Sequence, residues 1–67
     1  RFIVTGGGGT DLQFGYVAAK ELAVDGVIVL TDGYIPPVNS SNIPSLFVIV
    51  PGGISVPGYK NIFLLWN

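Results

Sequence analysis

The sequence predicts an α/β fold with a mostly parallel β-sheet, of the partial doubly wound, Rossmann-like kind. Three apolar runs without polar alternation stand at residues 27–30, 45–50 and 62–66. Such runs are typical of parallel strands that are covered on both faces. One clear amphipathic helical pattern, at residues 11–24, precedes the first of them. A segment of that length is long enough to connect two parallel strands.

The first expected strand is Phe2 to Val4, and a glycine-rich loop follows it. These residues are aromatic or β-branched, which favours a strand. Gly6 to Gly9 then fit only a loop, because glycine loses more conformational freedom in a helix or strand than any other residue. Taken alone, the four glycines suit a flexible turn as well as a binding loop.

A helix is expected over residues 11–24. Its apolar positions recur at intervals of four and three, at Leu12, Tyr16, Ala19 and Ala23. Thr10 or Asp11 is expected to cap its amino end, because a side-chain oxygen can accept a hydrogen bond from a free amide there. Asp25-Gly26 is expected to close it. Gly15 costs roughly 1 kcal/mol relative to alanine inside a helix, so either the first turn is loose or a neighbouring element packs closely against it.

The remaining strands are expected at residues 27–31, 45–50 and 61–66. Residues 33–44 hold three prolines, a glycine and an Asn-Ser-Ser-Asn cluster. This composition argues against a helix and predicts an exposed, ordered loop. Pro51-Gly52-Gly53 ends the second of these strands, and another irregular stretch leads to the last one.

Two loops place oxygen atoms directly after predicted strands. They are GGGGTD, residues 6–11, and TDG, residues 31–33. In a parallel sheet the carboxyl ends of the strands share one edge, where ligands bind, and oxygen ligands suit hard cations. Asp32 also suits a plain turn, since Asp-Gly is a common turn pair. Asp11 suits a helix cap better than a ligand position, and Thr31 and Tyr34 are expected to be structural or to lie at the rim of the site.

The order strand, GGGGTD, amphipathic helix, apolar strand, LTDGY, proline-rich loop, PSLFVIV and final strand resembles the carboxyl-terminal half of a von Willebrand factor A-like domain (VWA-like domain). It is most similar to the bacterial VWA-like domains at the end of metallopeptidase-like proteins. The resemblance implies a Mg²⁺ site built from a DxSxS motif on the first strand, a threonine from a later loop and an aspartate after the fourth strand. Thr10 and Asp32 match the last two parts, and this chain has no DxSxS motif.

The resemblance also implies that residues 1–67 form the carboxyl-terminal part of one such domain. Its central strand, missing from this chain, would separate the first strand from the next three. We therefore expect a protein-interaction module that holds Mg²⁺ through Thr10 and Asp32 and binds a protein partner or the remainder of the same domain. Two alternatives stay open: the end of a larger metallopeptidase-like protein, or a degenerate structural domain without metal.

Composition excludes several other functions. The basic residues Arg1, Lys20 and Lys60 are dispersed, whereas nucleic-acid binding needs a basic cluster. The GxGxxG fingerprint does not fit the glycine run, because Asp11 and Leu12 stand where its last glycine would be needed. A Walker loop does not fit either, because Thr10-Asp11 follows the last glycine where Lys-Ser or Lys-Thr would be needed. With no histidine or cysteine, a hydrolase would have to rely on aspartates and a metal ion, and nothing in the sequence positions a nucleophile. We therefore expect no enzyme activity in this chain.

The chain is unusually apolar, with 49% hydrophobic and only 10% charged residues. This composition is that of a core without its polar surface, and a chain of this length buries only about 60% of its unfolded surface, which leaves its stability marginal. We therefore expect these residues alone to aggregate or to pair with another chain. No apolar run approaches the length of a membrane span, and no signal-peptide pattern is present, so a cytoplasmic location is expected.

Overall fold

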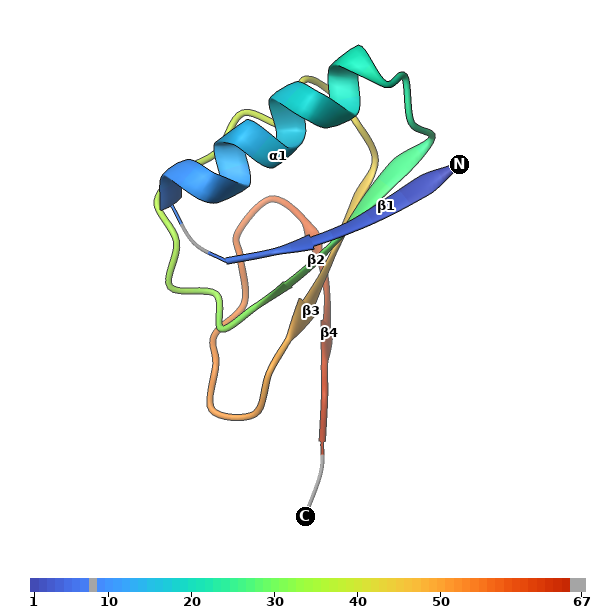
Figure 1. The fold of residues 1–67 in the computed structure, drawn as a ribbon. Helices are drawn as coiled ribbons and strands as arrows, with labels where there is room; N and C mark the ends of the chain where they lie inside the picture. Colours follow the sequence, from blue (N-terminus) through green and yellow to red (C-terminus); the bar gives the residue numbers. More distant parts are fainter. Residues whose placement is uncertain (8, 66–67) are drawn as a thin grey trace.

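A computed structural model describes residues 1–7 and 9–65 of the protein. Its one sheet contains four parallel strands in the order β1-β2-β3-β4, and a single helix, α1, connects the first two strands (Figure 1). The elements are β1 (Phe2–Gly6), α1 (Gly9–Glu21), β2 (Gly26–Thr31), β3 (Ser45–Ile49) and β4 (Lys60–Phe63). The α/β class and the parallel sheet are thus confirmed.

The strand that was expected between β1 and the rest of the sheet has no place in this arrangement. Strand β1 pairs directly with β2, from Phe2 opposite Gly26 to Gly6 opposite Leu30. The expectation of a missing central strand is therefore wrong for this structure. The physical reason is that α1 returns the chain to the adjacent strand position, and the backbone groups of β1 are satisfied there by β2.

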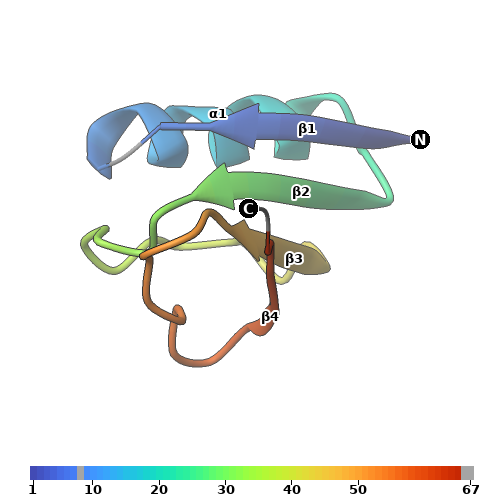
Figure 2. The ribbon, with the colours of Figure 1, turned by 90° about the horizontal axis from the view of Figure 1, so that it is seen from below.

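One face of the sheet is covered by α1 and by both long loops, as Figures 1 and 2 show from two sides. The buried apolar side chains come from α1, from β2 and β3, and from the loop before β4. They are Leu12, Tyr16, Ala19, Val27, Val29, Phe47, Ile49 and Val56. The prolines between β2 and β3 exclude a second crossover helix, so apolar loop residues such as Ile35 and Val38 pack on this core instead.

The opposite face of the sheet is open. Side chains alternate along a strand, and the register places two neighbouring rows on this face. One row runs from Val4 to Lys60 and the other from Gly6 to Ile62. The apolar side chains of this face are Phe2, Val4, Ile28, Leu30, Leu46, Val48 and Ile62. Val4 is 72% exposed and Leu30 is 46% exposed. The absence of polar alternation in the strands thus reflects a second face that no described residue covers.

Helix α1 begins and ends earlier than the pattern predicted. It starts at Gly9, so Thr10 and Asp11 lie in its first turn and the expectation that one of them caps it is wrong. Asp11 instead places its negative charge near the positive end of the helix dipole. At the other end Asp25-Gly26 does not close the helix, because Ala23 already turns the chain with a φ of 52°.

The glycine inside α1 is explained by the sheet. A Cβ at Gly15 would lie 3.2 Å from Oγ1 of Thr5 in β1. Of the two explanations that the sequence left open, close packing of a neighbouring element is therefore correct. This contact sets the distance between α1 and the first strand, just before the glycine loop that follows β1.

Candidate functional site

The loops after β2 and β3 are fastened together at the carboxyl edge of the sheet. The backbone amide of Val50 donates to the carbonyl of Thr31 at 3.0 Å, and that of Ile54 donates to the carbonyl of Asp32 at 2.8 Å. Both carbonyls are thereby satisfied within the protein. The backbone that carries the Asp32 side chain is therefore held by the neighbouring loop as well as by its own strand.

Glycine allows these loops to approach so closely. Gly33 has a φ of 86°, and a Cβ there would lie 1.8 Å from the carbonyl oxygen of Ile54. A Cβ at Gly53 would lie 2.5 Å from the carbonyl oxygen of Asp32. Asp32-Gly33 is thus a tight turn, as its composition predicts, but the turn also serves to lock two loops against one another.

The side chains of the turn are oriented by its own backbone. Oδ1 of Asp32 accepts a 2.9 Å hydrogen bond from the amide of Tyr34, and Oγ1 of Thr31 accepts a 3.2 Å hydrogen bond from the amide of Gly33. Thr31 is buried, whereas Asp32 is exposed. The carboxylate is therefore fixed in direction while it remains open to solvent, which suits a ligand-binding position.

A cavity of about 390 Å³ opens at this edge of the sheet. It is lined by Gly7, Thr31, Asp32, Tyr34 and Val50. These residues follow or end the three adjacent strands β1, β2 and β3. The structure therefore brings the glycine loop and the TDG turn to one cavity, as expected for the carboxyl ends of parallel strands.

Of the two predicted metal ligands, Asp32 is the one whose side chain the structure describes. Asp32 lines the cavity. Thr10 lies in the first turn of α1, directly after the glycine loop, but the position of its side chain falls outside what the structure describes. Thr31 and Tyr34, which were expected to be structural or rim residues, also line the cavity, and Val50 was not predicted as a site residue. The position of Tyr34 directly after LTDG was the one signal for it, and nothing in the sequence marked Val50.

The oxygen donors of this cavity suit Mg²⁺ only as a loosely held ion. Within residues 1–7 and 9–65, no three His, Cys, Asp or Glu side chains come together as a metal-binding group. The lining contributes one carboxylate, that of Asp32, and two hydroxyls, those of Thr31 and Tyr34. Mg²⁺ often binds proteins through one or two carboxylates and keeps several waters. The donor types fit this ion, and their small number predicts low affinity.

No protein-family model matches the sequence, and neither does any curated protein or solved structure. A function can therefore be inferred only from the geometry of the cavity and from the GGGGTD and LTDG motifs. In the part of the chain that the structure describes, no helix is both long enough and apolar enough to cross a membrane.

Proposed function

We propose that the protein is an interaction module of the VWA-like type, which binds a protein partner through a Mg²⁺ ion at the carboxyl edge of its sheet. The observation that carries this proposal is the exposed, oriented carboxylate of Asp32 in a cavity shared with the glycine loop. Asp32 would bind the ion directly, and the hydroxyl of Thr10 would reach it from the start of α1.

The proposed partner supplies an acidic side chain. A lone carboxylate such as Asp32 repels another carboxylate, whereas a divalent cation between them attracts both. Mg²⁺ seeks six oxygen ligands, and the few donors of this cavity leave positions for water and for the partner. The ion would thus bridge two acidic groups that cannot otherwise approach each other.

The two alternatives make different demands on the same cavity. A degenerate structural domain needs no metal, so Asp32 would act only as the acceptor for the Tyr34 amide. The terminal domain of a metallopeptidase-like protein would have its chemistry elsewhere in a longer chain. The fixed but exposed carboxylate favours the interaction module, because a purely structural turn does not require a cavity beside it.

Calorimetric titration of the full-length protein with Mg²⁺ tests the proposal. Asp32→Asn keeps the oxygen that accepts the Tyr34 amide but removes the charge, and we expect Mg²⁺ binding to be lost. Thr10→Ala is expected to weaken binding. Glu21→Gln, at the far end of α1, is the matched control and should bind as the wild type does. Equal Mg²⁺ binding by the wild type and Asp32→Asn would show that Asp32 is not a metal ligand and serves only as a turn residue.

A further inference from the structure

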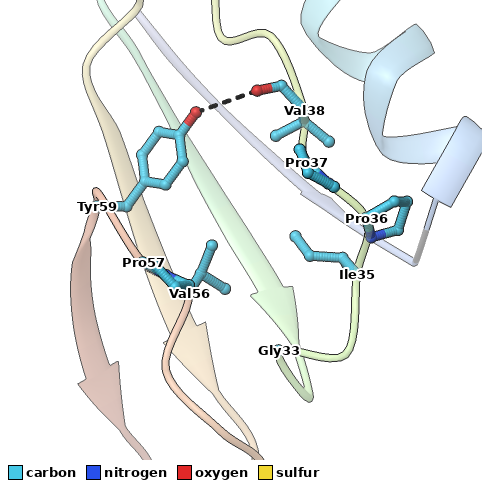
Figure 3. Close-up of a pocket in the computed structure, with 8 residues that line it drawn as sticks. All are labelled: Gly33, Ile35, Pro36, Pro37, Val38, Val56, Pro57 and Tyr59. Carbon is cyan, nitrogen blue, oxygen red and sulfur yellow. Dashed lines mark hydrogen bonds between the residues drawn. The ribbon is translucent and has the colours of Figure 1, made fainter.

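A second cavity of about 390 Å³ lies between the two long loops on the covered face of the sheet (Figure 3). One wall is the segment Gly33 to Val38 after β2, and the other is the segment Val56 to Tyr59 before β4. Gly33 and Ile35 line this cavity, whereas their neighbour Asp32 lines the first one. The two cavities therefore adjoin the same short segment but have separate linings.

Both walls are fastened to regular secondary structure. Gln13 of α1 pairs with the backbone of Asn39 through two hydrogen bonds, of 2.8 and 3.0 Å, which hold the first loop. Asn61 of β4 holds the second loop, since it accepts from the amide of Val56 at 2.7 Å and donates to the carbonyls of Val56 and Tyr59 at 3.0 and 2.8 Å. A ligand would thus enter a formed cavity without the entropy cost of ordering its walls.

The walls are apolar, with a single polar side chain. Three prolines, two valines and an isoleucine form most of the lining, and none of its described residues is charged. A charged ligand would lose its hydration there without gaining a counter-charge. The Tyr59 hydroxyl donates to the carbonyl of Val38 at 3.5 Å, which is long for an O–H donor. This hydroxyl can therefore turn to a better acceptor.

The Tyr59 ring itself is held in place. It packs on Phe47 of β3 with ring centroids 4.7 Å apart, in a tilted arrangement. The hydroxyl therefore has a defined position at the cavity. Because one water occupies about 30 Å³ in the liquid, the cavity has room for roughly a dozen non-hydrogen atoms. This is the size of a bicyclic aromatic molecule.

We propose that this cavity binds an uncharged, planar aromatic ligand that carries a hydrogen-bond acceptor. Its ring lies between the loop carrying Pro36 and Pro37 and the loop carrying Pro57, and its acceptor atom accepts a hydrogen bond from the hydroxyl of Tyr59. Binding of this ligand requires neither Asp32 nor a metal ion, so it stands apart from the proposed function.

Titration of the full-length protein with quinoline, followed by saturation-transfer difference NMR, tests this site. Quinoline is bicyclic and uncharged at neutral pH, and its ring nitrogen is an acceptor. We expect saturable binding with a dissociation constant on the order of 1 mM, given the modest affinity of small ligands. Tyr59→Phe keeps the ring but removes the donor, and should weaken binding about tenfold. The matched control is Tyr34→Phe, in the neighbouring cavity, which should bind as the wild type does.

Two further measurements can overturn the proposal. Pro57 is exposed and is followed by Gly58 in a turn, so Pro57→Trp adds bulk over the cavity at a tolerant position. Undiminished quinoline binding by a folded Pro57→Trp variant would contradict the site, as would equal effects of the two tyrosine substitutions. Binding of 1-naphthoate as tight as that of quinoline would contradict the preference for an uncharged ligand. Circular dichroism shows whether each variant is folded, and if Pro57→Trp is not, the tyrosine pair decides.

Discussion

The hydroxyl of Tyr16 in α1 donates a 2.7 Å hydrogen bond to Oγ of Ser45, the first residue of β3. Ser45 in turn donates to the carbonyl of Ile43 at 2.9 Å. The helix is thus connected to a strand that is not its sequence neighbour. This short chain of hydrogen bonds ties α1, the proline-rich loop and β3 together at the end of the sheet opposite the candidate site.

Removal of the hydroxyl should weaken this connection without disturbing the core. We expect Tyr16→Phe to lower the free energy of unfolding by about 1 kcal/mol, the usual net value of one hydrogen bond. The ring stays fully buried in either case. Urea denaturation measures the change. Tyr34→Phe is the control, because Tyr34 is exposed, and a loss of equal size there would contradict our assignment.

The same tyrosine should make stability depend on pH in the alkaline range. Burial raises the pKa of Tyr16 above its ordinary value, although the hydrogen bond with Ser45 opposes the shift. The contribution of the neutral Tyr16 side chain to the free energy of unfolding is therefore fully present below the unfolded-state pKa of about 10. It is lost as the pH rises through the higher pKa of the folded state. Denaturation between pH 9 and about 11 should show a steeper loss for the wild type than for Tyr16→Phe.

The regular elements could be predicted because their signals are local. Val27 and Val29 belong to a continuous apolar run, and such a run in a parallel sheet marks a buried strand. The helix ends were misplaced because their determinants are not in the periodicity. Nothing in an apolar pattern shows that Ala23 adopts a positive φ and ends α1.

The site could be predicted only in part, for a related reason. Asp32 follows a strand that the sequence identifies, so its position at the carboxyl edge of the sheet could be predicted. The cavity beside Tyr59 could not be predicted, because the positions of its two loops depend on side-chain hydrogen bonds. Gln13 holds Asn39 of the first loop from a helix 26 residues away, and Asn61 holds the second loop from the strand that directly follows it. Such side-chain hydrogen bonds leave no periodic trace. The direct pairing of β1 with β2 likewise depends on the sheet as a whole.

Gly33 and Gly52 allow a matched test of the loop contact. Both have a φ of 86°, but a Cβ at Gly33 would overlap the Ile54 backbone, whereas a Cβ at Gly52 would meet nothing within 4 Å. Gly52→Ala should therefore cost only the backbone strain, about 1 kcal/mol. Gly33→Ala should cost at least about 2 kcal/mol more, because two backbone segments must separate. Equal losses in denaturant unfolding would show that the loops separate readily.

Ala23 is a site where the protein should gain stability. The amide of Val24 donates to the carbonyl of Ala19 at 3.3 Å, and that of Ala23 donates to Lys20 at 3.1 Å. This is the Schellman pattern, which usually places glycine where Ala23 stands. We expect Ala23→Gly to raise the midpoint of thermal unfolding, with a gain of about 0.5 to 1 kcal/mol.

The reverse effect is expected one turn earlier. Ala18 is an exposed residue inside α1, where Ala18→Gly should lower stability by about 1 kcal/mol. The two substitutions are chemically identical, so opposite signs would isolate the effect of the backbone conformation. A destabilising Ala23→Gly would show that α1 does not end in this motif.

The open face of the sheet should make the isolated chain associate. Phe2, Val4 and Leu30 are all exposed on this face, and all-parallel sheets are found almost only with both faces covered. A contiguous apolar surface of this kind marks an interaction site or a tendency to aggregate. We therefore expect the 67-residue chain to sediment as oligomers or aggregates in analytical ultracentrifugation.

Two leucines of similar exposure distinguish association through the open face of the sheet from association through any exposed apolar side chain. Leu30 is 46% exposed on the sheet face, and Leu22 is 54% exposed just after α1. Leu30→Lys places a charge in the centre of the open face, where burial against another chain would cost several kcal/mol unless the charge were paired. It should shift the chain toward monomer, whereas Leu22→Lys should not. A monodisperse wild-type monomer with a cooperative thermal transition would show that one covered face is sufficient for this sheet.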